Sequence, residues 1–178
     1  MVLLKVGDTY VDYDYDLLVE HLNLLDSRIR EINEGIDASP DPDGEGLCDR
    51  GEYFIGSGFV AIQRYLTSAR SGSGLSLKEA FEVPPMVNSA TTFVEAINAA
   101  ANYWKHVEEW FEAILFKQNE SLKGNALATL KRLEKVTPWE DYTCSNVLAV
   151  LTLEENFELS SLLPSIAEWR KNLMQITK

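Results

Sequence analysis

Apolar residues recur every three or four positions along most of this chain, and that spacing limits the fold more than any other feature. The pattern is typical of amphipathic helices, each with one face turned to a core. The stripes occupy positions 18–36, 55–66, 93–114, 122–133, 139–151 and 162–176. We therefore predict an all-α fold, in which residues 1–178 form a single-domain bundle of five to six helices.

Local signals predict where the helices begin and end. Asp16 is a suitable N-cap for the first helix, and Gly35 is a suitable terminator. Thr92 and Glu95 have the spacing of a capping box at the start of the 93–114 helix. The stretch 37–51, with the sequence DASPDPDGEGLCDRG, is rich in Pro, Gly and Asp, so we predict an acidic loop there.

Residues 1–15 are predicted to form an N-terminal arm. Val11, Tyr13 and Tyr15 alternate with aspartates, so a short extended segment at this end is an option. On such a segment the alternating aspartates Asp12, Asp14 and Asp16 share one face, which we interpret as a solvated strand edge.

The charge of the chain is strongly acidic and unevenly distributed. The 178 residues include 16 Lys and Arg against 28 Asp and Glu, which gives a net charge of −12. Residues 1–60 hold 14 of the acids and 4 of the bases. This balance argues against DNA as a partner, because binding to a phosphate backbone requires a cationic surface. The acidic N-terminal third is instead suited to a basic protein partner.

Other compositional features predict a cytoplasmic protein without a cofactor. No apolar run is long enough to cross a membrane, and the N-terminus lacks the apolar core of a secretory signal. Cys48 and Cys144 have no CxxC spacing, which indicates two reduced thiols. Gly56, Gly58 and Ala61 match a dinucleotide-binding spacing, but the required flanking strands are missing, so we expect close helix packing there instead.

The acidic loop also contains oxygen ligands at regular intervals. Calcium is bound by six to eight oxygens around a turn-forming glycine, with a bidentate Glu at the end of the loop. The stretch from Asp41 to Glu52 resembles the calcium loop of an EF-hand in this respect. The candidate ligands are Asp41, Asp43, Glu45, Asp49 and Glu52, with Gly46 at the turn. A solvated acidic turn explains the same residues, and both interpretations stay open.

The 93–114 helix has a second face that is unusual for a solvated surface. It combines small, aromatic and polar residues: Ala99, Asn102, Tyr103, His106, Trp110 and Ala113. A helix with two apolar faces is expected to be covered on both sides. We therefore predict that this face is an interface through which the chain forms a homo-oligomer.

Asn102 and His106 on that face are also candidate catalytic residues, since side chains four positions apart on a helix are neighbours. The segment Ala101–His106 weakly resembles the HEPN-type helical domains, which carry Arg, a polar residue and a later His on one helix. The resemblance implies metal-independent RNA cleavage at a dimer cleft by an Arg and His pair. Asn102 and His106 match the polar residue and the His, whereas Ala101 stands in the place of the Arg.

Three functional hypotheses follow from the sequence. The leading one is a non-catalytic, acidic helical protein for interaction or assembly that associates with itself. The alternatives are a diverged HEPN-like ribonuclease that uses His106 and a calcium-binding protein that uses Asp41 to Glu52. The sequence does not decide whether the chain is an enzyme, and it favours a non-catalytic protein.

Overall fold

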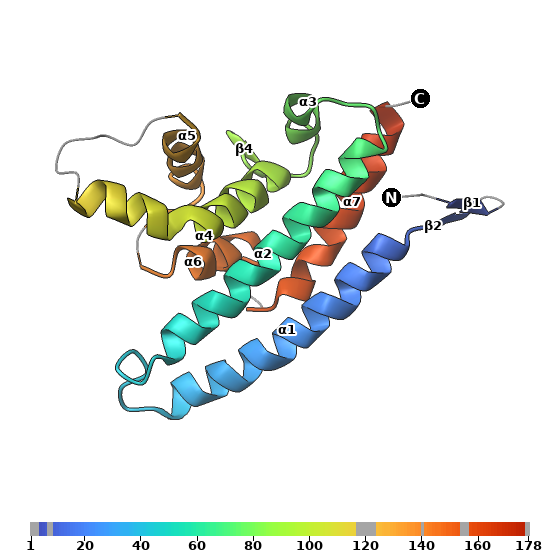
Figure 1. Ribbon diagram of the computed structural model, residues 1–178. Coiled ribbons are helices and arrows are strands. Elements are labelled where there is room, and N and C mark those ends of the chain that lie inside the picture. Colours follow the sequence, from blue (N-terminus) through green and yellow to red (C-terminus); the bar gives the residue numbers. More distant parts are fainter. Residues whose placement is uncertain (1–3, 7–8, 117–123, 140, 154–156, 177–178) are drawn as a thin grey trace.

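The computed structural model describes residues 4–6, 9–116, 124–139, 141–153 and 157–176, and its fold is all-α, as predicted. Two long antiparallel helices, α1 (Tyr13–Ala38) and α2 (Leu47–Ser71), form a hairpin (Figure 1). The other helices of the described part are α3 (Leu77–Phe81), α4 (Phe93–Phe116), α5 (Gly124–Leu133), α6 (Thr143–Leu151) and α7 (Leu163–Ile176). A short 3₁₀-helix, η1 (Leu159–Leu162), leads into α7. The described residues thus contain seven α-helices, slightly more than the five to six predicted.

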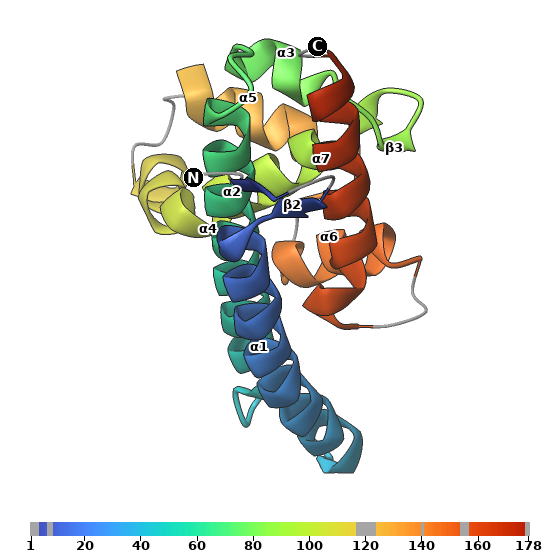
Figure 2. The same ribbon diagram turned by 90° about the vertical axis from the view of Figure 1, so that its right-hand side faces the viewer.

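The helices surround α2, which is the central element of the fold. Figure 1 shows α4 crossing α2, with α5 and α6 beside α4, while α7 lies on another side of α2. In the turned view of Figure 2, the end of α1 and the start of α2 project beyond the other helices. Apolar side chains from all these elements meet in one core, and the largest fully buried ones include Phe59, Ile97, Leu148 and Trp169. Burial of each such side chain stabilises the fold by roughly 1.5–3 kcal/mol.

The start of α1 differs from the prediction. The helix begins at Tyr13 rather than after Asp16, because the Asp12 carboxylate caps it by accepting the Tyr15 backbone N–H at 3.1 Å. The optional extended segment is therefore helical from Tyr13 onward, and strand structure at this end of the described chain is a hairpin of β1 (Leu4–Val6) and β2 (Thr9–Val11). The interpretation of Asp12 as part of a solvated edge is also wrong, since its exposed fraction is 6%.

The acidic loop is shorter than the predicted stretch 37–51. Helix α1 passes through Gly35 to Ala38, and α2 begins at Leu47, so only residues 39–46 connect the two helices. Gly35 does not end the helix because the α2 residue Leu47 packs beside it, and tertiary packing outweighs the weak helix propensity of glycine. Gly46 has a φ of 68° and turns the chain into α2, a conformation that favours glycine.

The end signal predicted for α4 is confirmed, and one hairpin was missed. Thr92 and Glu95 form the predicted capping box of α4, with backbone to side-chain distances of 3.3 and 3.2 Å. The antiparallel strands β3 (Met86–Asn88) and β4 (Thr91–Thr92) precede α4 and were not predicted, because strands of two or three residues leave no readable alternation. Cys48 and Cys144 are both free thiols. Within the described residues, no helix has the length and apolar character needed to cross a membrane.

Candidate functional site

Trp104 on α4 lies directly against the backbone of α2. A Cβ atom at Gly56 would lie only 2.3 Å from the Trp104 indole, so no other residue leaves room for the ring in this position. Gly58 is just as tightly packed, since a Cβ there would lie 2.3 Å from Leu159. The predicted role of these two glycines in close helix packing is therefore confirmed, and Ala61 lies farther along α2, half-buried.

An open groove runs between α2 and α4 beside this contact. Its volume is about 500 Å³, and its walls are mainly the side chains of Tyr53, Val60, Trp104 and Val107. The Tyr53 ring meets the Trp104 ring edge to face at 5.4 Å, while 60% of Tyr53 stays exposed. Aromatic side chains held in this way offer a large apolar contact area with little conformational freedom left to lose.

Polar side chains form a bridge beside the groove and fix the two helices relative to each other. The Gln63 amide nitrogen donates to Asn98 at 2.8 Å and to Asn102 at 3.0 Å. Lys105, which lines the groove, donates its Nζ to the Gln63 amide oxygen at 2.8 Å. Partial burial lowers the pKa of Lys105 from its usual value.

Carboxylates outnumber basic groups around the rest of the groove, where Arg50 is also exposed on α2, three residues before Tyr53. Glu108 lines it from α4, and Asp49 is exposed on α2 four residues before Tyr53, hence on the same side of that helix. The loop between α1 and α2 continues the acidic surface with Asp41, Asp43 and Glu45, which are all exposed. An aromatic groove therefore lies next to the acidic end of the helical hairpin.

The predicted interface on α4 is divided between the core and the surface. Ala99 and Tyr103 are buried in the core of the chain itself, with exposed fractions of 1% and 6%, and burial raises the pKa of the Tyr103 phenol. His106 stays exposed, and its ring stacks on the half-buried Trp110 at a centroid distance of 6.3 Å. Ala113 belongs to α4, but its side chain is outside the part that the structure describes.

The two candidate catalytic residues have separate partners. Asn102 accepts a hydrogen bond from Gln63, on the side of α4 that faces α2. His106 lies with its Nδ1 3.4 Å from a Glu109 carboxylate oxygen instead. A cleavage site would also need a group that stabilises charge on a phosphate, and Ala101 is buried and apolar. The ribonuclease alternative stays a prediction, tested by comparing RNA cleavage by the parent chain and by His106→Ala.

The candidate calcium ligands are spread over different contacts. Asp41 accepts the Gly44 backbone N–H, and Asp43 accepts the Tyr142 hydroxyl. Glu52 caps α6: its carboxylate accepts the backbone N–H groups of Cys144 and Ser145 at 2.7 and 2.8 Å. No group of three His, Cys, Asp or Glu side chains in the described residues is arranged to hold a metal ion. A calcium ion would have to compete with α6 for Glu52, and the calcium loop stays a prediction.

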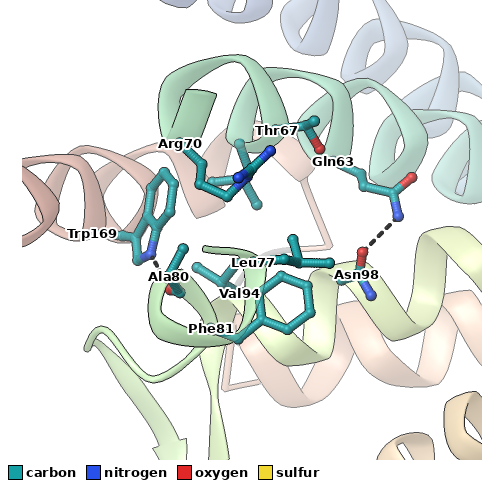
Figure 3. A pocket seen from close by; sticks show the side chains of 10 residues that line it. Gln63, Thr67, Arg70, Leu77, Ala80, Phe81, Val94, Asn98 and Trp169 are labelled. Carbon is teal, nitrogen blue, oxygen red and sulfur yellow. Dashed lines mark hydrogen bonds between the residues drawn. The ribbon is translucent and has the colours of Figure 1, made fainter. Parts of the chain in front are cut away.

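A small cavity between α2, α3, α4 and α7 has no room for a ligand. Figure 3 shows its lining, including Arg70, Phe81, Asn98 and Trp169, and its volume is about 10 Å³. That volume admits at most one water molecule. The Trp169 indole N–H donates to the Ala80 carbonyl at 3.1 Å, which attaches α7 to α3. The cavity is thus a gap in the packing around α2.

Comparisons with protein-family models, with curated proteins and with solved structures return no match. Only the geometry of this chain therefore bears on its function.

Sequence reasoning missed the groove between α2 and α4. It assigned Trp104 to the core stripe of its helix and gave no role to Tyr53. A usable signal was present, since Tyr53 lies three residues before Gly56, in a helix whose glycines were already expected to allow close packing. What the sequence did not reveal is which helix approaches those glycines.

Proposed function

We propose that this chain is a non-catalytic interaction protein whose groove between α2 and α4 binds a basic and apolar segment of a partner protein. The observation that carries the proposal is the edge-to-face pair of the exposed Tyr53 and the half-buried Trp104 in an open groove of about 500 Å³. Tyr and Trp are the residues most often found at the centre of protein interfaces. A rigid aromatic pair that remains open to solvent is well suited to anchor an apolar side chain.

The charges around the groove favour a basic segment over an acidic one. Asp49 and Glu108 flank the aromatic pair, and the exposed acids of the loop lie beyond Asp49. The one Lys that lines the groove, Lys105, is held by Gln63. A Lys or Arg in the bound segment would meet both carboxylates and aromatic faces, so charge attraction and cation–π contact act together. These carboxylates and aromatic faces support the basic protein partner that the acidic N-terminal third of the sequence suggests.

The experiment is a titration with synthetic peptides, followed by intrinsic Trp fluorescence and calorimetry. Two sets of peptides have equal length and the same apolar residues, but one set carries Lys and Arg and the other Asp and Glu. We expect binding of basic peptides only, with affinity that weakens as salt rises. Equal binding of both sets, or binding of neither, would overturn the proposal.

A matched pair of variants locates the binding surface. Tyr53→Ala removes one aromatic wall without touching the core and should weaken peptide binding by about tenfold or more. Leu153→Ala removes a comparably exposed apolar side chain, 78% exposed, outside the groove and should leave binding unchanged. If both variants bind as the parent does, the peptide site is not this groove.

A further inference from the structure

Helix α1 carries a second apolar surface, separate from the groove between α2 and α4. Tyr13, Leu17 and Leu24 point away from the core, with exposed fractions of 63%, 63% and 66%. Their spacing of four and seven residues places them on one stripe of the helix. Single exposed apolar residues are common on protein surfaces, whereas three large ones along one helix form an apolar surface that a partner can cover.

A hollow lies beside this stripe on the same face of the molecule. It is a groove of about 700 Å³ between the first half of α1 and the second half of α2, lined by Leu17, His21, Ala61 and Arg64 among others. An exposed apolar stripe next to a groove suits a two-fold interface, in which the same patch of both copies is in contact.

Opposite charges flank the stripe. Helical geometry puts Asp16 and Glu20 on the flank away from α2, and His21 on the flank toward α2. His21 and the exposed Arg64 line the same groove, so they are neighbours across the two helices. Among the described residues, Arg64 has no carboxylate within ion-pair distance. One flank is therefore acidic, whereas the groove on the other flank is lined by two arginines, Arg64 and Arg70, against one carboxylate, Asp14, which accepts a hydrogen bond from Ser68.

We propose that a second copy of this chain docks on α1, with the two α1 stripes face to face and running in the same direction. A two-fold axis parallel to α1 brings the acidic flank of each copy against the basic flank of the other, so that Glu20 approaches Arg64 of the second copy. The antiparallel arrangement brings acidic flank to acidic flank and is disfavoured by repulsion. The two stripes then cover each other's exposed leucines, and Glu20 of the second copy reaches the groove that Arg64 lines.

The oligomeric state of the full chain tests this dimer, measured by size-exclusion chromatography with light scattering and by sedimentation over a range of concentrations. We expect the parent to be dimeric and the double variant Leu17→Ser and Leu24→Ser to be monomeric with an unchanged helical circular dichroism spectrum. Leu153→Ser is the control and should remain dimeric. A parent that is monomeric at every concentration, or a double variant that still dimerises, would overturn the proposal.

Charge reversal tests the direction of the two helices. Glu20→Arg and Arg64→Glu should each weaken the dimer by about tenfold, and the two changes combined in one chain should restore it, because the pair is then reversed. If the combined variant is weaker than either single variant, the parallel arrangement is wrong.

One further variant distinguishes this surface from the α4 face. If Trp110→Ala breaks the dimer while the double leucine variant does not, self-association uses the exposed part of the α4 face instead. Tyr53 belongs to neither surface, so peptide binding in the groove between α2 and α4 can fail or succeed independently of dimerisation.

Discussion

Tyr65 donates its hydroxyl to the buried carboxylate of Asp12 at 2.7 Å, and Arg170 approaches the same carboxylate from α7 at 2.6 Å. The Arg170 guanidinium also lies over the Tyr15 ring, 4.7 Å from its centroid. These residues join α1, α2 and α7 at one point, and each polar group has a partner. A buried carboxylate is tolerable only when it is compensated in this way.

This cluster predicts a loss of stability at alkaline pH. Burial, and then the hydrogen bond to Asp12, raises the pKa of Tyr65 well above its ordinary value of 10. The pKa values of Tyr15 and Tyr103 are raised as well, mainly by burial. The folded state therefore keeps protons that the unfolded chain releases above pH 10. The stabilisation is fully present below that pH and is lost as pH rises further, by up to about 1.4 kcal/mol per pH unit for each phenol.

Urea unfolding between pH 7 and 11 measures this effect, with Tyr65→Phe as the matched variant. The variant should lose about 1 kcal/mol at neutral pH, because Asp12 loses a donor, and should show a shallower decline above pH 10. Equal alkaline slopes for parent and variant would show that Tyr65 ionises normally in the folded protein.

The contacts of Glu52 predict that a single substitution there destabilises the protein. Its carboxylate accepts three hydrogen bonds from the start of α6, two from backbone N–H groups and one from the Ser145 hydroxyl. Glu52→Ala should therefore lower the free energy of unfolding by about 1–3 kcal/mol. Glu45→Ala removes an exposed carboxylate from the nearby loop and should change it by less than about 0.5 kcal/mol. Similar effects of the two changes in urea unfolding would contradict the capping role.

At the scale of elements, helices with long regular stripes could be predicted, whereas both ends of α1 and the packing partners of the helices could not. The stripe of α4 and its capping box were readable because both depend on residues close together in the sequence. The start of α1 was misplaced because the position of Asp12 depends on Tyr65 and Arg170, far along the chain. The groove was missed for the same reason, since it exists only where α4 crosses α2.

The crossing of α2 and α4 predicts opposite effects of the same substitution at two glycines. Gly56→Ala places a Cβ atom 2.3 Å from the Trp104 ring and should destabilise the protein by about 1–3 kcal/mol, with a changed Trp fluorescence spectrum. At Gly51, the nearest atom to an added Cβ is 3.8 Å away, on Ile32. Gly51→Ala should therefore stabilise α2 by about 0.5–1 kcal/mol through helix propensity. Thermal unfolding of both variants tests this prediction. A change of melting temperature in the same direction for both variants would contradict the close contact at Gly56.

At the scale of the whole molecule, part of the uneven charge of the chain has a structural role. The buried Asp26 carboxylate on α1 accepts the backbone N–H groups of Leu159 and Ser160 at 2.7 and 2.9 Å, where η1 begins. Asp26 and Glu52 thus attach the hairpin of α1 and α2 to the start of two later helices, where the helix dipole favours negative charge. The acids of the loop at the far end of the hairpin stay exposed, so a basic partner can reach them.

Because the far end of the hairpin of α1 and α2 lacks these attachments, we predict uneven protection from hydrogen exchange along the hairpin. No residue of α1 after Ile32 is buried, and no residue of α2 before Gly51 is buried, so the projecting end seen in Figure 2 has little core of its own. The end should open locally and exchange well before the middle of either helix, where Ile29 and Phe59 are buried and exchange requires global unfolding. Peptide-resolved mass spectrometry compares residues 33–38 with residues 18–29 of the same helix. Equal protection in the two segments would show that the hairpin opens only as a unit. When a basic peptide binds beside Tyr53, we expect hydrogen exchange to slow first at residues 47–53.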